Sequence, residues 1–117
     1  MDRESRAKVV EFFELSPGRY PAKDWLLGLK SRDDRQRIFR RLEHLQAGNR
    51  GDWKGLGDGV SELRCAFGPG YRIYFGEDGP QLVILLAGGD KSTQGKDISK
   101  AKRHWAVYGA RKRGSQP

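Results

Sequence analysis

The sequence contains few of the residues that build disulfides and metal sites. Its 117 residues include a single cysteine, Cys65, and only two histidines. One cysteine cannot form an internal disulfide, and nothing in the chain has the paired spacing of Cys and His ligands around zinc. We therefore expect no internal disulfide and no structural metal ion.

Long apolar segments are also missing. The longest apolar run, residues 82–87, is far shorter than the roughly 20 residues that cross a bilayer as a helix. Residues 1–8 are charged and lack the apolar centre of a secretory signal. These features argue against a membrane partner, and we expect a cytoplasmic protein.

Positive charge, by contrast, is plentiful. The 23 Lys and Arg residues outnumber the 15 Asp and Glu residues, so the formal net charge is +8. Such a balance favours a polyanionic partner, which can be RNA, DNA or an acidic protein. A contribution to solubility alone is the simpler alternative. The length suits one domain with one core.

Hydrophobic periodicity and turn residues divide the chain into seven expected elements. We predict strands at residues 9–15, 60–67, 71–75 and 82–87, and helices that begin at Pro21, after Ser31 and after Thr93. The glycine-rich residues 49–59 are expected to form a loop. The resulting order, β-α-α-β-β-β-α, predicts an α+β fold with its helices mainly on one face of the sheet. Residues 1–108 would form the domain and residues 109–117 a basic, disordered tail.

Four segments of the chain resemble the toxins of the RelE/ParE superfamily. They are residues 25–30 (WLLGLK), 60–64 (VSELR), 68–75 (GPGYRIYF) and 85–94 (LLAGGDKSTQ). Their order and spacing are most similar to the HigB-like, phage-associated addiction module killer branch, and the likeness spans roughly residues 8–107. It implies a RelE-like fold: a mainly antiparallel sheet with an N-terminal helical hairpin and a C-terminal helix.

The resemblance also implies an activity and partners. A toxin of this kind belongs to a type II toxin–antitoxin system and cuts mRNA on the ribosome without a metal or other cofactor, which inhibits translation. Its second partner is a cognate antitoxin, typically a helix-turn-helix protein. The ParE branch instead inhibits DNA gyrase, and a non-catalytic nucleic-acid or protein interaction module is a third possibility. Fold alone does not separate these activities.

Metal-free RNA cleavage needs a base for the 2′-hydroxyl, cations around the phosphate and an acid for the leaving oxygen. The resemblance implies that Arg72, in the segment GYR, contacts the scissile phosphate. An arginine suits that task because its planar fork donates two parallel hydrogen bonds. The other candidate catalytic residues are Arg64 and Glu62 on the preceding strand and Lys91 after two glycines. Glu62 can equally form a structural ion pair with an arginine beside it.

Four further residues are candidate RNA contacts, namely Trp53, Lys54, Tyr74 and Lys96. Trp53 can stack on a base and Lys54 can bind the RNA backbone, although a tryptophan that covers a sheet edge is the alternative. The catalytic tyrosine usual in this family is missing near the start of the last helix, where Lys96 and Asp97 stand. Tyr74 can take its place or can be a packing residue.

Overall fold

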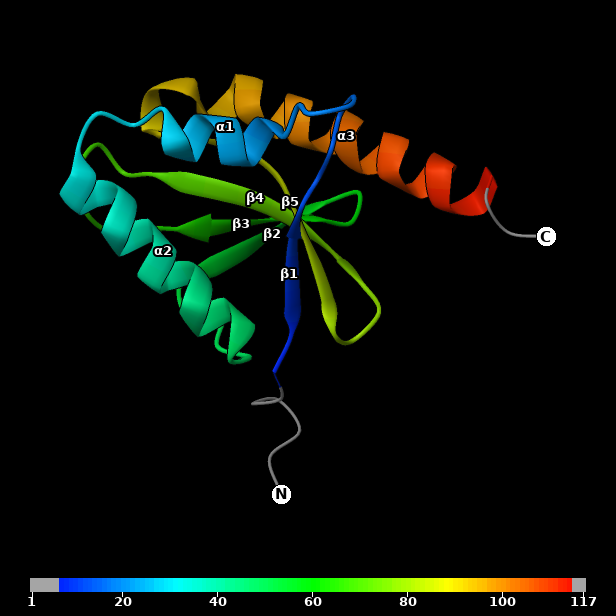
Figure 1. Ribbon diagram of the computed structural model, residues 1–117, viewed down its shortest axis with the longest axis horizontal. Helices are drawn as coiled ribbons and strands as arrows, with labels where there is room; N and C mark the ends of the chain where they lie inside the picture. Colours follow the sequence, from blue (N-terminus) through cyan, green and yellow to red (C-terminus); the bar gives the residue numbers. More distant parts are fainter. Residues whose placement is uncertain (1–6, 115–117) are drawn as a thin grey trace.

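A five-stranded mixed sheet with helices on both faces organises residues 7–114, the part of the chain that this computed structural model describes (Figure 1). The strands are β1 (Val9–Phe12), β2 (Trp53–Gly57), β3 (Val60–Arg64), β4 (Arg72–Asp78) and β5 (Leu82–Gly89). The helices are α1 (Pro21–Leu27), α2 (Arg32–Gln46) and α3 (Gln94–Gly114), and a single 3-10 turn, η1 (Lys91–Thr93), precedes α3. The structure is therefore α+β.

The apolar strand β5 lies inside the sheet. The strand order is β1-β5-β4-β3-β2, in which β1 pairs with β5 in parallel and every other neighbouring pair is antiparallel. Alternate residues of β5 face opposite sides: Val83 and Leu85 enter one core, while Ile84 and Leu86 enter the other. A continuous apolar run is the pattern expected for a strand buried on both faces.

The first core lies between the sheet and the helical pair α1 and α2. Leu26, Ile38 and Leu45 pack there against Ile73 and its neighbours, and all are almost completely buried. Helix α2 begins as its sequence predicts, because Ser31 is the N-cap and its hydroxyl accepts the Asp34 N–H at 3.1 Å.

The second core lies beneath α3. Ala101 is fully buried there, and Trp105 packs so closely on β4 that a Cβ at Gly76 would come within 2.5 Å of its ring. His104 is also buried and stacks on Phe13, with 5.1 Å between ring centroids. Its Nδ1 lies 2.8 Å from the carbonyl oxygen of Leu86. Since a carbonyl oxygen only accepts, Nδ1 carries the proton.

The predicted fold, the RelE-like order β-α-α-β-β-β-α, was wrong. The residues expected to form a glycine-rich loop include a fifth strand, β2, so the observed order is β-α-α-β-β-β-β-α, with α1 and α2 between β1 and β2. This edge strand was hard to recognise because Gly55 and Gly57 interrupt any alternation and only Leu56 is partly buried. The helices also cover both faces, since α3 packs on the side that was expected to stay partly open.

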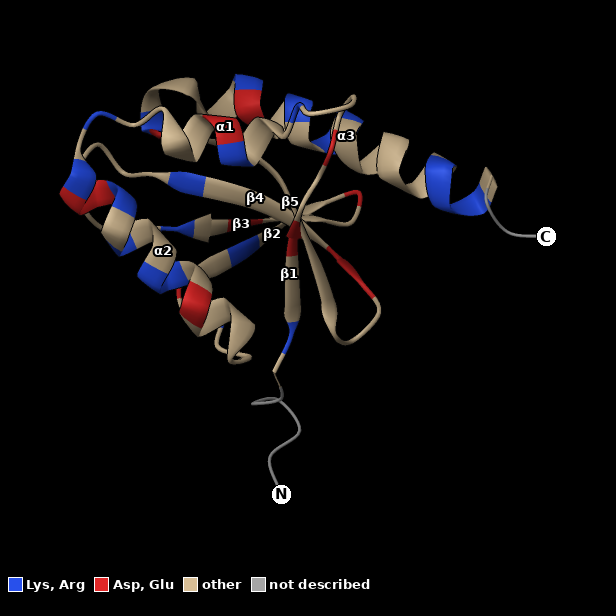
Figure 2. Cartoon of the chain, viewed as in Figure 1, with Lys and Arg blue, Asp and Glu red and all other residues tan. Residues whose placement is uncertain are grey.

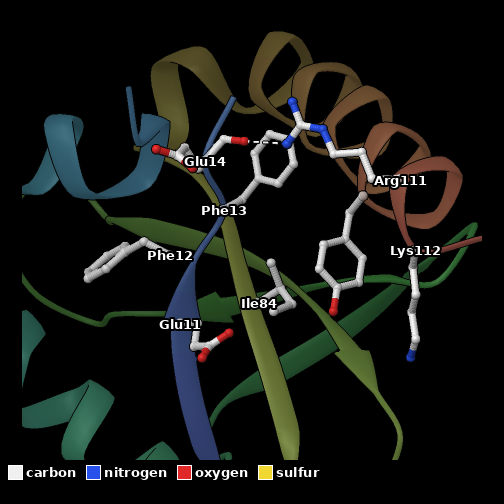
Figure 3. A pocket seen from close by; sticks show the side chains of 8 residues that line it. Glu11, Phe12, Phe13, Glu14, Ile84, Arg111 and Lys112 are labelled. Atoms are coloured by element: carbon white, nitrogen blue, oxygen red, sulfur yellow. Dashed lines mark hydrogen bonds between the residues drawn. The ribbon is translucent and has the colours of Figure 1, made fainter. Parts of the chain in front are cut away.

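The C-terminal tail was expected to be disordered from Gly109, but α3 continues to Gly114. Side chains near its end hold the last turns in place. Arg111 donates to the main-chain carbonyls of Glu14 and Leu15 and lies over the Phe13 ring (Figure 3), and Lys112 pairs with Asp78. Residues 115–117 lie outside the described residues. Neither α3 nor any other helix within residues 7–114 combines the length and apolar character needed to cross a membrane.

His104 gives the fold a testable dependence on pH. Burial is the main cause that lowers the pKa of His104 below its usual value of 6.5. The unfolded chain therefore binds a proton that the folded chain does not, so this contribution to stability is present above pH 6.5 and is lost as the pH falls below it. We expect the free energy of unfolding in urea to fall between about pH 7.5 and about pH 5, and to fall less in His104→Gln.

The exposed His44 on α2 provides the control for this experiment. His44→Gln should keep the pH dependence of the unmodified chain. Equal slopes in the unmodified chain and in His104→Gln would contradict the assignment of this effect to His104.

Candidate functional site

Three cationic residues of the sequence analysis meet at one end of the sheet. Arg64 ends β3 and Arg72 begins β4, and the antiparallel register places them directly opposite each other. Lys91 lies in η1, two residues after Gly89, which pairs with Arg72 across the sheet. All three line one cavity of about 520 Å³, which we call the cationic cavity. In Figure 2 the cationic stretches of β2, β3 and β4 lie on the same side of the molecule as the arginine-rich α2.

Arg72 is held in place beside the cationic cavity. Its residue exposure is only 9%, and its Nη1 donates to the carbonyl of Gly70 at 3.0 Å. Its Nε is buried and has no hydrogen-bond partner. Because Arg72 also lines the cavity, its guanidinium group offers an anion there a positive charge that is already fixed in position.

Glu62 contacts both arginines of the cationic cavity but does not line the cavity itself. Only 1% of it is exposed, and its carboxylate accepts from Arg64 Nε at 3.2 Å and from Gln94 Nε2 at 3.1 Å. Arg72 Nε lies 3.7 Å away, close enough for an ion pair but too far for a hydrogen bond. The geometry therefore favours a structural role for Glu62. Its carboxylate positions the two arginines and does not reach the surface where a substrate would be.

Lys54 and Trp53 were expected on a loop but lie on β2. Lys54 pairs with Glu62 in the register, so it shares the face of the sheet that carries the cationic residues, and it is exposed. Trp53 points to the opposite face because successive strand residues alternate. It is 43% exposed and stacks with Arg50, whose guanidinium carbon is 4.9 Å from the ring centroid. Lys54 therefore shares a sheet face with the cationic residues and Trp53 does not, but neither residue lines the cationic cavity.

Tyr74 and Lys96 are not brought into the cationic cavity. Tyr74 is completely buried beneath α3, and its hydroxyl has no hydrogen-bond partner. Burial is the main cause that raises the pKa of Tyr74, with Glu62 adding to it, so the phenol stays protonated and out of reach of RNA. Lys96 is exposed on the first turn of α3 but is not among the residues that line the cavity.

Sequence reasoning missed Asp52, a carboxylate residue that lines the cationic cavity. Its main-chain carbonyl accepts from Arg64 N at 2.9 Å and from Arg41 Nη2 at 3.0 Å, which fixes the backbone just before β2. Residues 49–59 were expected to form a loop, so no periodic pattern indicated that Asp52 lies at a functional position. Cys65 also lines the cavity, but burial raises the pKa of its thiol to about 11, so it is not a thiolate nucleophile at neutral pH.

No group of three or more His, Cys, Asp and Glu side chains that could hold a metal ion occurs within residues 7–114. The chemistry available at the cationic cavity is consequently that of two guanidinium groups, an ammonium group and one accessible carboxylate. These groups can bind a phosphate and can transfer protons.

Comparison with known proteins identifies a relative of the chain. No family model matches it. Over 78 residues the chain is 51% identical to an uncharacterized protein of Haemophilus influenzae, and the match covers 67% of this chain and 79% of that protein. The chain therefore belongs to the same family as the Haemophilus influenzae protein.

The burial of Glu62 predicts an unusually large loss of stability when its charge is removed. Glu62→Ala leaves Arg72 buried without its counter-ion, and breaking a buried pair in this way costs about 3–5 kcal/mol. The matched control is Glu77→Ala, because Glu77 also pairs with an arginine, Arg50 at 2.8 Å, but is 26% exposed. A pair of that kind is worth about 1 kcal/mol or less. Urea unfolding that shows equal losses in the two variants would contradict the organising role of Glu62.

Proposed function

We propose that this chain is a metal-independent endonuclease that cuts mRNA on the ribosome, and that it is the toxin of a type II toxin–antitoxin system of the RelE/ParE superfamily. The single observation that carries the proposal is the cationic cavity, which Arg64, Arg72 and Lys91 line together. The four-segment resemblance supports the same activity. The proposal places the protein in the cytoplasm with a helix-turn-helix antitoxin as its partner.

The cavity can support an in-line attack within one strand of RNA. The 2′-oxygen of the ribose forms a bond to phosphorus, its proton passes to the Asp52 carboxylate, and the bond from phosphorus to the 5′-oxygen breaks. The Lys91 ammonium gives a proton to that leaving oxygen. The products are a 2′,3′-cyclic phosphate and a 5′-hydroxyl, and no metal or redox partner is needed for the balance. Asp52 replaces Glu62 as the proton acceptor because Glu62 is buried and already accepts two hydrogen bonds.

The two arginines would stabilise the charge that builds up on the phosphate as it is attacked. Fixed donors aimed at developing charge are usually the largest contribution to such reactions. Arg72 is fixed by its bond to Gly70 and by burial, and Arg64 is fixed by Glu62. The groups are therefore arranged before the substrate arrives, so little reorganisation is needed during the reaction.

A second candidate function is binding of nucleic acid without cleavage. The complete burial of Tyr74 favours it, because that residue cannot serve as the acid that the family usually supplies through a tyrosine. Both functions require the arginines, but only cleavage requires Asp52 to accept a proton. The two are therefore separable by substitution.

Arg72→Ala should lower the rate of mRNA cleavage by about 10²–10³-fold, because it removes a fixed donor to the phosphate. The measurement is mapping of new RNA 5′ ends after induced expression, where in-frame cuts within translated codons are expected for the unmodified chain and should be largely lost in Arg72→Ala. Arg103→Ala, an exposed arginine on α3, is the control and should cut normally. If Arg72→Ala folds, as judged by urea unfolding, and still cuts and still arrests growth, the proposal fails.

Asp52→Asn should separate cleavage from binding. Loss of a general base lowers the rate by about 10²–10⁴-fold, while the affinity for RNA should stay the same or rise because a negative charge has been removed. Single-turnover cleavage on programmed ribosomes gives the rate, and co-sedimentation gives the affinity. Unchanged cleavage in Asp52→Asn would assign the base to another group, and binding without any cleavage by the unmodified chain would favour the second candidate function.

A further inference from the structure

A second cavity, of about 290 Å³, lies beside the cationic cavity at the same end of the sheet. Its walls come from α1, from the end of β5 and from the start of α3, and they include Trp25, Asp97 and Lys100. We call it the Trp25 cavity. The two cavities share one turn, because Asp90 lines this one and the next residue, Lys91, lines the other. Its volume is at the lower end of the roughly 300–1,000 Å³ typical of ligand pockets, which suits one flat group.

Two glycines bring the cavity walls close to the backbone of β5. A Cβ at Gly88 would lie 2.2 Å from an atom of the Trp25 ring, and a Cβ at Gly89 would lie 1.8 Å from Asp97 Oδ2. Neither position can therefore carry a side chain in this arrangement. Pairing between β1 and β5 ends at Leu85, so residues 87–89 have no strand beside them on that edge. The cavity thus combines an aromatic wall, a carboxylate and a strand edge.

Asp97 has an unusual environment for a carboxylate. Only 6% of the residue is exposed, yet its hydrogen-bond donor in the structure is the single hydroxyl of Thr93. No Lys or Arg within residues 7–114 lies within 4.0 Å of it in an ion pair. An ionised carboxylate accepts up to about four hydrogen bonds, and Asp97 lines the cavity with one such bond made. Asp97 therefore has acceptor positions that a ligand with N–H donors would fill.

We propose that the Trp25 cavity binds one nucleobase of the RNA, that this base is guanine, and that it belongs to a nucleotide next to the phosphate in the cationic cavity. The inference rests on the proposed function. Guanine is the standard base that presents two parallel donors, its N1–H and its N2 amine, along one edge, and this edge matches one carboxylate. Trp25 supplies the stacking surface, as aromatic side chains do for unpaired bases. Asp97 is then a specificity residue for the cleavage reaction.

The test uses NMR on the isotopically labelled 117-residue chain with three separate probes: guanosine, inosine and inorganic phosphate. Guanosine should shift the amide signals of Gly88 and Gly89 and the indole N–H of Trp25. Inosine lacks the N2 amine and should bind about tenfold more weakly, because it loses one hydrogen bond to a charged group. Phosphate should shift the side-chain N–H signals of Arg64 and Arg72 instead.

Asp97→Asn should weaken guanosine binding about tenfold and abolish the preference over inosine. Asp78→Asn is the matched control, since Asp78 also accepts from a hydroxyl, that of Tyr108, but lies outside both cavities. It should keep the preference. If Asp97→Asn fails to fold, the comparison of guanosine with inosine on the unmodified chain decides the question.

The outcomes separate this inference from the function on which it rests. Phosphate binding at Arg64 and Arg72 with no response to guanosine, or with equal affinity for guanosine and inosine, would overturn the base site and leave the endonuclease proposal intact. A guanosine response at Trp25 without any phosphate response would support the base site and count against the endonuclease.

Discussion

A carboxylate that is almost completely buried must be surrounded by donors, and Glu62 meets this requirement with groups from three elements. Its own strand supplies Arg64, β4 supplies Arg72 and the start of α3 supplies Gln94. The same contacts fix the two arginines at the edge of the cationic cavity and tie α3 to the sheet. The candidate site and the packing of the last helix therefore depend on one buried charge, which explains why positive side chains can lie so close together there.

Some of the structure was visible in the sequence because it follows from local rules. The apolar run of residues 82–87 indicated a strand buried on both faces, and β5 is that strand. Ser31 indicated the start of a helix, and it caps α2. The element order was wrong because β2 has little local signal: its pairing with β3 relies on main-chain hydrogen bonds, which glycine makes as well as any residue. The placement of α3 over the second face depends on tertiary packing, which periodicity does not encode.

The candidate site was predictable to a similar extent. Alternation along β3 and β4 placed Glu62, Arg64 and Arg72 on one face, and the structure brings these residues together with Lys91. The accessible carboxylate was missed because Asp52 precedes a strand that was not expected. Tyr74 was a candidate RNA contact with packing as the alternative, and its face is covered by α3. Strand alternation identifies which residues share a face, but it does not show which part of that face a helix will cover.

The parallel pairing of β1 with β5 joins residues that are far apart in the chain, since Val9 lies opposite Leu82 and Phe12 opposite Leu85. Contacts of such long sequence separation form slowly, because the loop between them must close first. During synthesis β1 cannot pair until β5 has been made, and Lys91 and Gln94 are made later still. The cationic cavity therefore forms only after its lining residues, which fall between positions 52 and 91, have all been synthesised. Until Gln94 has been made, Glu62 lacks one of the donors that surround its carboxylate, so the anchor of the two arginines is incomplete.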